Sequence, residues 1–405
     1  MNPSNRVTVL AGVVLAPLAL AAPLALAGPA RAATAGCAVS VPYRAGEGGY
    51  ASYRIPAVLG TPRGTLLAFA EGRRDGAGDS GTIDVVVRRS RDGGCSWGET
   101  SVVAAGDGDT RGNPAPVVDP RTGDVVLVTT YNSGRVTEAQ IMRGEVTPEQ
   151  GRRVFVQRSD DDGRRFGDPE EITAEAVRPG WRWYATGPGH ALALTRGPHT
   201  GRLVVPADHS AAPPEGSPDT GREARYYGAH ALYSDDGGHT WHLGFTDDTY
   251  DGTANTNETS AAQLPDGRIY FSSRDQNGSA PDNRLAAYSS DGGATLDAPF
   301  APQPGLEDVP VVQASVLQLA GEKAPLLFSG PSDPTARRAL AVWSGTDGAR
   351  TFTRRRTFSE RPAAYSDLVQ LDPATAGCLY ETGTGGAYDT IEFRRLPLGE
   401  LLKGG

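Results

Sequence analysis

Cysteine is scarce in this chain of 405 residues, which contains only three. Cys37, Cys95 and Cys378 can form at most one internal disulfide, and their positions alone do not select the pair. The six histidines show no spacing, to one another or to cysteine, that is typical of a metal site. The sequence therefore gives no sign of a metal centre.

Nucleotide-binding loops and helical periodicity are also missing. The glycine-rich segment 46–49 lacks the Gly-Lys-Ser/Thr ending of a phosphate-binding loop. Apolar residues instead alternate with polar ones, as in segments 83–87 and 202–205, and this pattern favours strands over helices. With 52 glycines and 31 prolines, the composition fits many short strands joined by turns.

The chain has one long apolar run, residues 7–27, close to its N-terminus. Arg6 precedes the run, and Ala30-Arg31-Ala32 follows it with the small-x-small pattern of a signal peptidase site. A membrane anchor is the alternative, but two prolines interrupt the run. We interpret residues 1–32 as a signal peptide cleaved near Ala32 and expect a secreted, extracellular protein.

Negative charge is in excess over the rest of the chain. Removing residues 1–32 deletes Arg6 and Arg31 and no acid, so the net charge changes from −9 to −11. This balance disfavours nucleic acid and anionic membrane surfaces as partners.

Five near-copies of one short motif divide the chain after residue 33. Their shared pattern is Ser-x-Asp-x-Gly-x-Thr-aromatic, seen as SDDGGHTW in segment 234–241. Asp236 can accept backbone N–H bonds inside a tight turn, Gly238 can supply a positive φ, and Trp241 can begin the next strand and pack inward. A calcium loop is the alternative, but no copy supplies a glutamate at the twelfth position. The aspartates recur at positions 92, 161, 236, 291 and 347.

This spacing is that of a four-stranded blade, and repeats of such a size are typical of a propeller or a solenoid. Five marked blades and one unmarked blade predict an all-β, six-bladed β-propeller of four-stranded antiparallel blades over residues 33–405. Arg54 lies among apolar strand residues, where an unpaired buried charge would be too costly. Since inner strands line the central channel of a propeller, we expect Arg54 to face a ligand site there.

The segment Tyr53-Arg54-Ile55-Pro56, followed by the repeated turns, resembles the bacterial exo-sialidases (neuraminidases), a family of six-bladed propellers with Asp boxes. The resemblance covers nearly all of residues 37–398. It implies a retaining exo-α-sialidase that hydrolyses terminal sialic acids on glycans, glycoproteins and gangliosides through a covalent sialyl-tyrosine intermediate. It implies no cofactor and no membrane span, and we expect a monomer.

The resemblance also implies roles for individual residues. Asp79, in a D-x-x-x-I-D segment, matches the acid/base, Tyr365 the nucleophile, and Glu258 the glutamate that activates this tyrosine. The matches to substrate-binding residues are Arg54, Arg274 and Arg337 for the carboxylate, Arg73 on the side of the sugar O4, Asn113 beside the sugar, and Glu381, which holds the first arginine.

The chemistry of sialic acid explains these residue types. Three arginines can bind its carboxylate through planar, charge-assisted bonds. A carboxylate nucleophile would be repelled by the substrate anion, whereas a neutral tyrosine is not, and sialidases are an established exception to the paired-carboxylate glycosidases. With an ordinary pKa of about 10, Tyr365 needs a base such as Glu258 at neutral pH.

Several alternatives stay open. A trans-sialidase, an intramolecular trans-sialidase or a hydrolase of the deaminated sugar would use the same catalytic residues, and the acceptor site and N-acyl pocket decide among them. Trp181, Trp183 and Tyr184 are candidates for those surfaces. A non-catalytic secreted propeller that binds glycans or proteins is the alternative from another class, but it would have no need of Tyr365 and Asp79.

Overall fold

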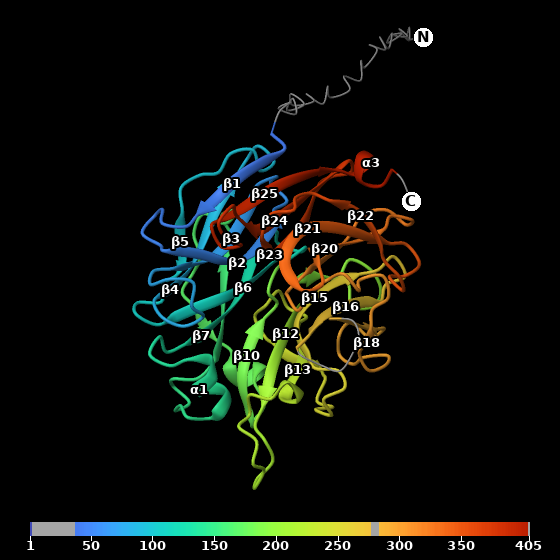
Figure 1. Ribbon diagram of the computed structural model, residues 1–405. Helices are drawn as coiled ribbons and strands as arrows, with labels where there is room; N and C mark the ends of the chain where they lie inside the picture. The colour runs from blue at the N-terminus through green and yellow to red at the C-terminus, as the bar shows by residue number, and fades with distance from the viewer. Residues whose placement is uncertain (2–36, 277–282, 404–405) are drawn as a thin grey trace. The chain divides into compact units, whose positions relative to one another are not determined.

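Strands make up nearly all of the regular structure in the computed structural model (Figure 1), as the alternating sequence predicts. The structure describes residue 1, residues 37–276 and residues 283–403. Apart from Met1, the expected signal peptide lies outside these residues. Within the described part, no helix is both long and apolar enough to cross a membrane.

Four of the sheets are single blades. One contains β15 (Thr256–Gln263), β16 (Ile269–Asp275), β17 (Arg284–Ser289) and β18 (Ala301–Pro302). Another contains β19 (Ser315–Gln318), β20 (Leu326–Asp333), β21 (Ala336–Gly345) and β22 (Thr353–Thr357). A third contains β10 (Trp181–Thr186), β12 (Leu203–Ala211), β13 (Tyr227–Ser234) and β14 (His242–Thr246), with the short β11 (Leu192–Ala193) beside β12.

The fourth blade joins the two ends of the unit. It contains β23 (Ala363–Asp372), β24 (Thr375–Thr382), β25 (Thr390–Pro397) and, on the outside, β1 (Val39–Arg44). β1 pairs antiparallel with β25 through Ser40 and Phe393 and through Tyr43 and Ile391, which is the closure expected for a ring. A disulfide between Cys37 and Cys95 fastens the start of β1, with a Cα–Cα distance of 5.5 Å.

The fifth sheet has eight strands, so the prediction of six separate four-stranded blades is wrong. It contains β2 (Ser52–Gly60), β3 (Leu66–Arg73), β4 (Ile83–Ser90), β5 (Ser101–Ala104), β6 (Thr110–Val118), β7 (Val125–Asn132), β8 (Arg153–Ser159) and β9 (Glu170–Glu171). The physical reason is one parallel pairing, Ile83 with Thr110, which joins β4 to β6. The Ile83 N–H donates to the Asp109 carbonyl at 3.1 Å, and strand pairing continues across this point.

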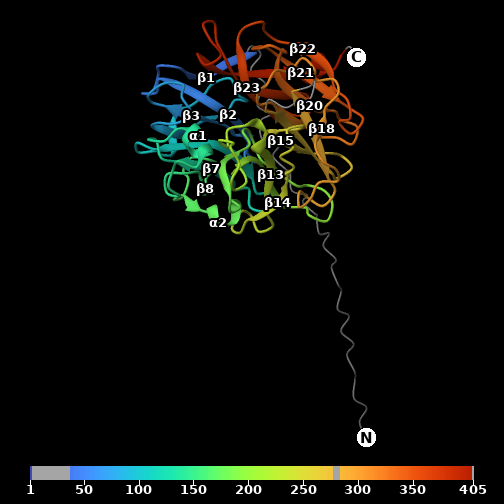
Figure 2. The same ribbon diagram turned by 60° about the horizontal axis from the view of Figure 1, so that its bottom comes forward.

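The sheets follow one another in chain order around the unit (Figure 2). Contacts join β2 to β6, β6 to β10, β12 to β15, β15 to β19 and β19 to β23. β23 returns to β2, where the Val58 N–H donates to the Asp367 carboxylate at 2.8 Å. The fold is therefore an all-β propeller, and its innermost strands surround a common axis.

The repeated turn has the predicted geometry. Asp236 accepts hydrogen bonds from the N–H groups of His239 and Thr240 at 3.0 and 2.9 Å, and Gly238 has φ 85°. Trp241 is buried and lies directly before β14. The turns are therefore local structures that connect the outer strands of a blade.

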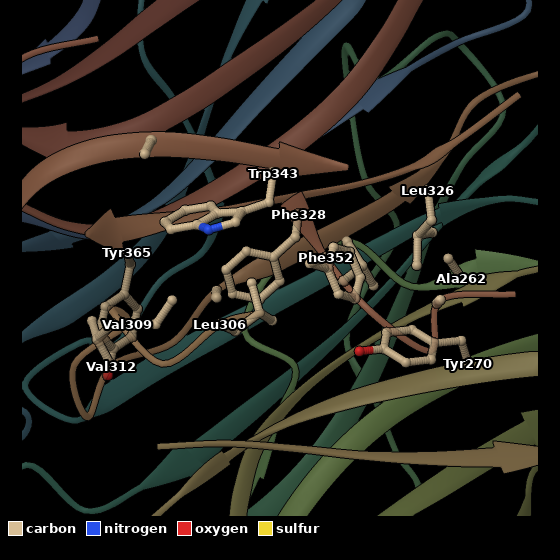
Figure 3. Close-up of a cluster of buried hydrophobic side chains, with 14 of the residues drawn as sticks. Ala262, Tyr270, Leu306, Val309, Val312, Leu326, Phe328, Trp343, Phe352 and Tyr365 are labelled. Carbon is tan, nitrogen blue, oxygen red and sulfur yellow. The ribbon is translucent and has the colours of Figure 1, made fainter. Parts of the chain in front are cut away.

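Large apolar side chains fill the space between neighbouring blades. Figure 3 shows one such cluster, in which Phe328, Trp343 and Phe352 pack with Tyr270. Tyr365, on β23, belongs to the edge of the same cluster. Core packing thus holds the ring of Tyr365 beside the axis.

Helices are few and short in the described residues: α1 (Glu138–Arg143), α2 (Thr173–Ala176), α3 (Leu398–Leu401) and a 3₁₀ turn (Ala224–Tyr226). Thr137 caps α1 in a reciprocal pair with Gln140, and Gly144 ends the helix at φ 69°. These caps hold Glu138, in the first turn, close to the propeller axis.

Candidate active site

A cavity of about 230 Å³ opens at the propeller axis. The structure brings the sequence-predicted site residues together here. Eight of them line the cavity: Arg54, Arg73, Asp79, Asn113, Glu258, Arg274, Arg337 and Tyr365. The ninth, Glu381, lies directly behind Arg54 and is fully buried.

Glu381, on β24, organises one wall of this cavity. It accepts two hydrogen bonds from the Arg54 guanidinium, at 3.1 and 3.3 Å, and one from the Ile55 N–H at 2.9 Å. Ile55 has a positive φ of 57°, a costly conformation for a β-branched residue, at an irregularity in the pairing of β2 with β3. A further bond from the Tyr365 N–H, at 3.2 Å, links Glu381 to the backbone of β23. One carboxylate therefore positions both Arg54 and Tyr365.

Tyr365 and Glu258 form the centre of the cavity. The Tyr365 hydroxyl donates a short hydrogen bond to Glu258 Oε1, and Arg274 binds the other carboxylate oxygen at 2.7 Å. Burial raises the pKa of Tyr365 well above its usual value and Glu258 raises it further, although Arg274, Arg54 and Arg337 act in the opposite direction. Tyr365 is therefore held in its neutral form, with a proton acceptor already in contact.

Asp79 lies at the mouth of the cavity, in the loop between β3 and β4, with 54% of its side chain exposed. Arg73 holds it at 2.8 Å, and the nearest nitrogen of Arg54 is 3.6 Å away. Burial acts to raise the pKa of Asp79, but Arg73 and Arg54 outweigh this effect and lower it. Asp79 can therefore reach a bound molecule.

Asp84, five residues further along the chain, is buried and does not line the cavity. Its carboxylate accepts from Tyr50 and Arg74 at 2.7 Å and from the Gly106 N–H at 2.8 Å. These partners satisfy the carboxylate within the blade, so Asp84 has a structural role.

Arg337 and Arg338 point to different surroundings. Arg337 lines the cavity, where it donates to the Tyr388 hydroxyl at 3.1 Å. The Arg338 side chain is 49% exposed and forms long ion pairs with Asp333 and Glu360 at the surface. The third arginine of the cavity is thus Arg337.

Asn113 lies on β6 with a positive φ of 51°, and its N–H donates to Glu71 at 2.8 Å. Glu71 also accepts from the Arg73 guanidinium at 2.6 and 3.0 Å. Asn113 Oδ1 is the acceptor for Arg152 at 3.3 Å. Asn113 therefore reaches the cavity through a network that includes two residues the sequence did not single out.

Sequence reasoning missed several side chains that line the cavity: Glu71, Glu138, Arg152, Asp208, Tyr227, Asn257 and Gln276. The sequence could have indicated that Arg152 and Asp208 face the cavity, because each is a charged residue beside or within an apolar strand segment, as Arg54 is. Of the three aromatic candidates, only Trp183 lines the cavity. Trp181 stacks on His209 with ring centroids 3.8 Å apart, and Tyr184 is buried inside the blade.

Over residues 37–276 and 283–403, no group of three His, Cys, Asp or Glu side chains is arranged to hold a metal ion.

Known proteins resemble this chain along most of its length. Residues 64–377 match the family described as a BNR repeat-like domain. A sialidase of Micromonospora viridifaciens is 32% identical over 85% of this chain, which spans 52% of that protein. An exo-alpha-sialidase of Aspergillus fumigatus is 31% identical over 88% of this chain and 86% of its own length.

Solved structures agree on the fold. A Hadza microbial sialidase superposes with a TM-score of 0.73 at 24% identity, covering 88% of this chain and 68% of that one. A leech intramolecular trans-sialidase, complexed with 2,7-anhydro-Neu5Ac, has the same TM-score at 16% identity and covers 91% and 71% of the two chains.

Proposed function

The chain belongs to the exo-α-sialidase family of glycoside hydrolases, and we propose that it hydrolyses terminal sialic acids with net retention through a covalent intermediate on Tyr365. The observation that carries this proposal is the contact between the Tyr365 hydroxyl and Glu258, inside a cavity lined by three arginines. Arg54, Arg274 and Arg337 supply the positive charge that a sugar carboxylate requires.

In the first step the Tyr365 oxygen attacks the anomeric carbon as the bond to the leaving oxygen breaks. The tyrosine proton passes to Glu258, and Asp79 donates a proton to the leaving oxygen. In the second step water attacks the same carbon, Asp79 accepts its proton, and Glu258 returns a proton to Tyr365.

Asp79 must be protonated for the first step, yet Arg73 and Arg54 lower its pKa. A substrate carboxylate bound to Arg54 supplies negative charge close to Asp79 and removes water from it. Both effects raise the pKa of a carboxyl group. Substrate binding therefore raises the pKa of Asp79 and favours the protonated form that the first step requires.

The substrates that fit this chemistry are sialylated glycans, glycoproteins and gangliosides. A secreted protein is consistent with the Cys37–Cys95 disulfide, because disulfides persist in oxidising compartments. We further propose that the eight-stranded sheet acts as two blades, β2–β5 and β6–β9, which gives a ring of six. We also propose that the protein is a monomer.

Two measurements test the proposal. Hydrolysis of an aryl α-sialoside establishes the activity, and proton NMR of the earliest product from sialyl-lactose establishes the stereochemistry. We expect α-sialic acid first and the β anomer only after mutarotation. An initial β anomer contradicts a double displacement at Tyr365, and a 2,7-anhydro product identifies intramolecular transfer instead of hydrolysis.

A further inference from the structure

A second cavity adjoins the active-site cavity at Asp79. Its volume of about 570 Å³ lies within the range of about 300–1,000 Å³ that is typical of small-molecule sites. Asp79, Glu138 and Tyr227 line both cavities. Because Asp79 donates its proton to the leaving oxygen, the group attached to that oxygen lies at the entrance of the second cavity, which we call the leaving-group cavity.

Apolar side chains form part of the leaving-group cavity. Ala139 and Met142, on α1, line it together with Ala224 in the 3₁₀ turn. The hydroxyl of Tyr227, another lining residue, is bonded to the Met142 sulfur at 3.4 Å and is therefore already used. This surface can pack against the carbon framework of a sugar but offers it few hydrogen bonds.

Arg222 supplies the missing polar group. Of the described residues that line the leaving-group cavity, it is the only cation. Its side chain is exposed and forms no ion pair or hydrogen bond with another described residue. Arg225, in the same loop, is instead bonded to Asp219 and lies over the ring of Tyr226. Arg222 therefore presents a guanidinium whose charge is not neutralised by a neighbouring acid.

The turn that carries Arg222 is fixed against α1. Gly221 approaches the helix so closely that a Cβ there would lie 2.5 Å from the Met142 carbonyl oxygen. Arg182 joins the two segments, because it donates to the Met142 carbonyl at 2.7 Å and to the Thr220 carbonyl at 3.5 Å. The backbone at Arg222 is thus already ordered, so binding a ligand need not pay for that order.

Two carboxyl groups, Asp79 and Glu138, also line the leaving-group cavity. Asp79 must carry a proton when it acts as the acid. Burial raises the pKa of Glu138, and the negative charges of Asp79 and Glu258 add to this effect, although Arg152 acts in the opposite direction. With Asp79 protonated and Glu138 shifted toward its neutral form, the charge of Arg222 dominates the cavity during the first step.

We propose that Arg222 makes the enzyme selective for leaving groups that carry a carboxylate, as when the terminal sialic acid is linked to a second sialic acid. The inference rests on the proposed function and adds a substrate class to it. A guanidinium binds a carboxylate through paired, charge-assisted hydrogen bonds, while the apolar surface packs against the second sugar. The added negative charge close to Asp79 also favours the protonated form of this acid.

The experiment compares kcat/KM for two substrates that differ in one charge. One is an α2,8-linked sialic acid dimer, and the other is the same dimer with its reducing-end carboxylate converted to an amide. We expect the native enzyme to prefer the charged dimer by about 5-fold, the size of an exposed ion pair, and added salt to weaken this preference. Arg222→Gln should abolish the preference.

The matched control is Arg225→Gln, which makes the same change of charge in the same loop. The Arg225 side chain does not line the leaving-group cavity and is bound to Asp219. This variant should therefore keep the preference of the native enzyme for the charged dimer.

Equal kcat/KM for the two dimers, or a preference that Arg222→Gln does not change, overturns the inference and leaves the proposed function intact. Cleavage of an aryl α-sialoside without cleavage of either dimer has the same meaning. Sialyl-lactose sulfated on its galactose carries a different anion. If Arg222→Gln slows its cleavage but not that of the charged dimer, Arg222 recognises a sulfate and the inference is overturned.

If no sialoside is cleaved, the proposed function fails, and calorimetric binding of the two dimers decides the selectivity. Tighter binding of the charged dimer to the native protein, lost in Arg222→Gln, supports the inference. Equal binding of the two dimers overturns it.

Discussion

The repeated turns and the active-site cavity both depend on carboxylates, but the two regions satisfy them in opposite ways. Asp236 in a turn accepts all its protein hydrogen bonds from residues within four positions of it. In the cavity, Glu381 binds Arg54 across 327 positions and Glu258 binds Tyr365 across 107. A turn carboxylate is thus supported by its own segment, whereas a cavity carboxylate depends on the closed ring.

This difference separates stability from chemistry. The turn aspartates accept N–H bonds that would otherwise be unpaired, so their removal should affect folding. The cavity carboxylates face cations and a neutral hydroxyl, and this arrangement serves the reaction of a bound substrate. A substitution in a turn should therefore lower the free energy of unfolding with little effect on kcat. A substitution in the cavity should lower kcat with little effect on the free energy of unfolding.

The largest expected effect is that of Tyr365→Phe. The substitution removes the attacking oxygen but keeps the ring that packs at the edge of the apolar cluster. We expect kcat to fall by about 10⁴-fold or more, as for other essential nucleophiles, with little change in Tm. Steady-state kinetics on sialyl-lactose and a thermal melt provide the measurements.

Asp236→Ala is the matched control from the turns. It removes the acceptor for His239 and Thr240 and should cost about 1–2 kcal/mol of unfolding free energy while kcat is retained. If Asp236→Ala abolishes activity in a protein that is still folded, the two regions are coupled and the proposed separation is wrong.

Asp79→Asn should have the next largest effect, and its size should depend on the leaving group. General acid catalysis contributes about 10²–10⁴-fold when the leaving group needs a proton. Turnover of sialyl-lactose should therefore fall far more than formation of the intermediate from an activated aryl sialoside. Pre-steady-state release of the phenol measures the second quantity.

Asp84→Asn is the internal comparison for that result. Asp84 binds Arg74, Tyr50 and the Gly106 N–H inside the blade, so its substitution should lower stability without a dependence on the leaving group. If Asp84→Asn alone loses activity to an extent that depends on the leaving group, then Asp84 and not Asp79 is the acid/base residue.

The same contrast explains what could be predicted from the sequence. The turns were predictable because Ser234, Asp236 and Gly238 determine their geometry within one segment. The inward position of Arg54 followed from the cost of burying an unpaired charge among apolar residues.

Other features depend on the path of the whole chain. The merging of β4 with β6 results from one pairing between Ile83 and Thr110, and the repeat carries no sign of it. The stacking of Arg152 on Trp183 brings together side chains from β10 and from the residue before β8. The residues next to Arg152 in the sequence give no sign that it stacks on Trp183, and those next to Trp183 give no sign that an arginine covers its ring.

The smallest expected effect is the acid sensitivity contributed by a single turn. Burial acts to raise the pKa of Asp92, but hydrogen bonds from Ser96, Ser90 and the Cys95 N–H outweigh it and lower the pKa to about 2. An aspartate in the unfolded chain has a pKa of about 3.9. The folded state therefore binds fewer protons than the unfolded state between these values, and stability falls as the pH decreases through this window.

Asp92→Asn removes the titrating group and keeps an acceptor oxygen, so its unfolding free energy should decline less steeply than that of the native protein between about pH 4 and pH 2. Because Asp92 is partly exposed, solvent screening makes this difference small. Urea titrations at a series of pH values, with the disulfide intact, measure it, and parallel curves for the two proteins would show that the turn carboxylate is not stabilised by its own segment.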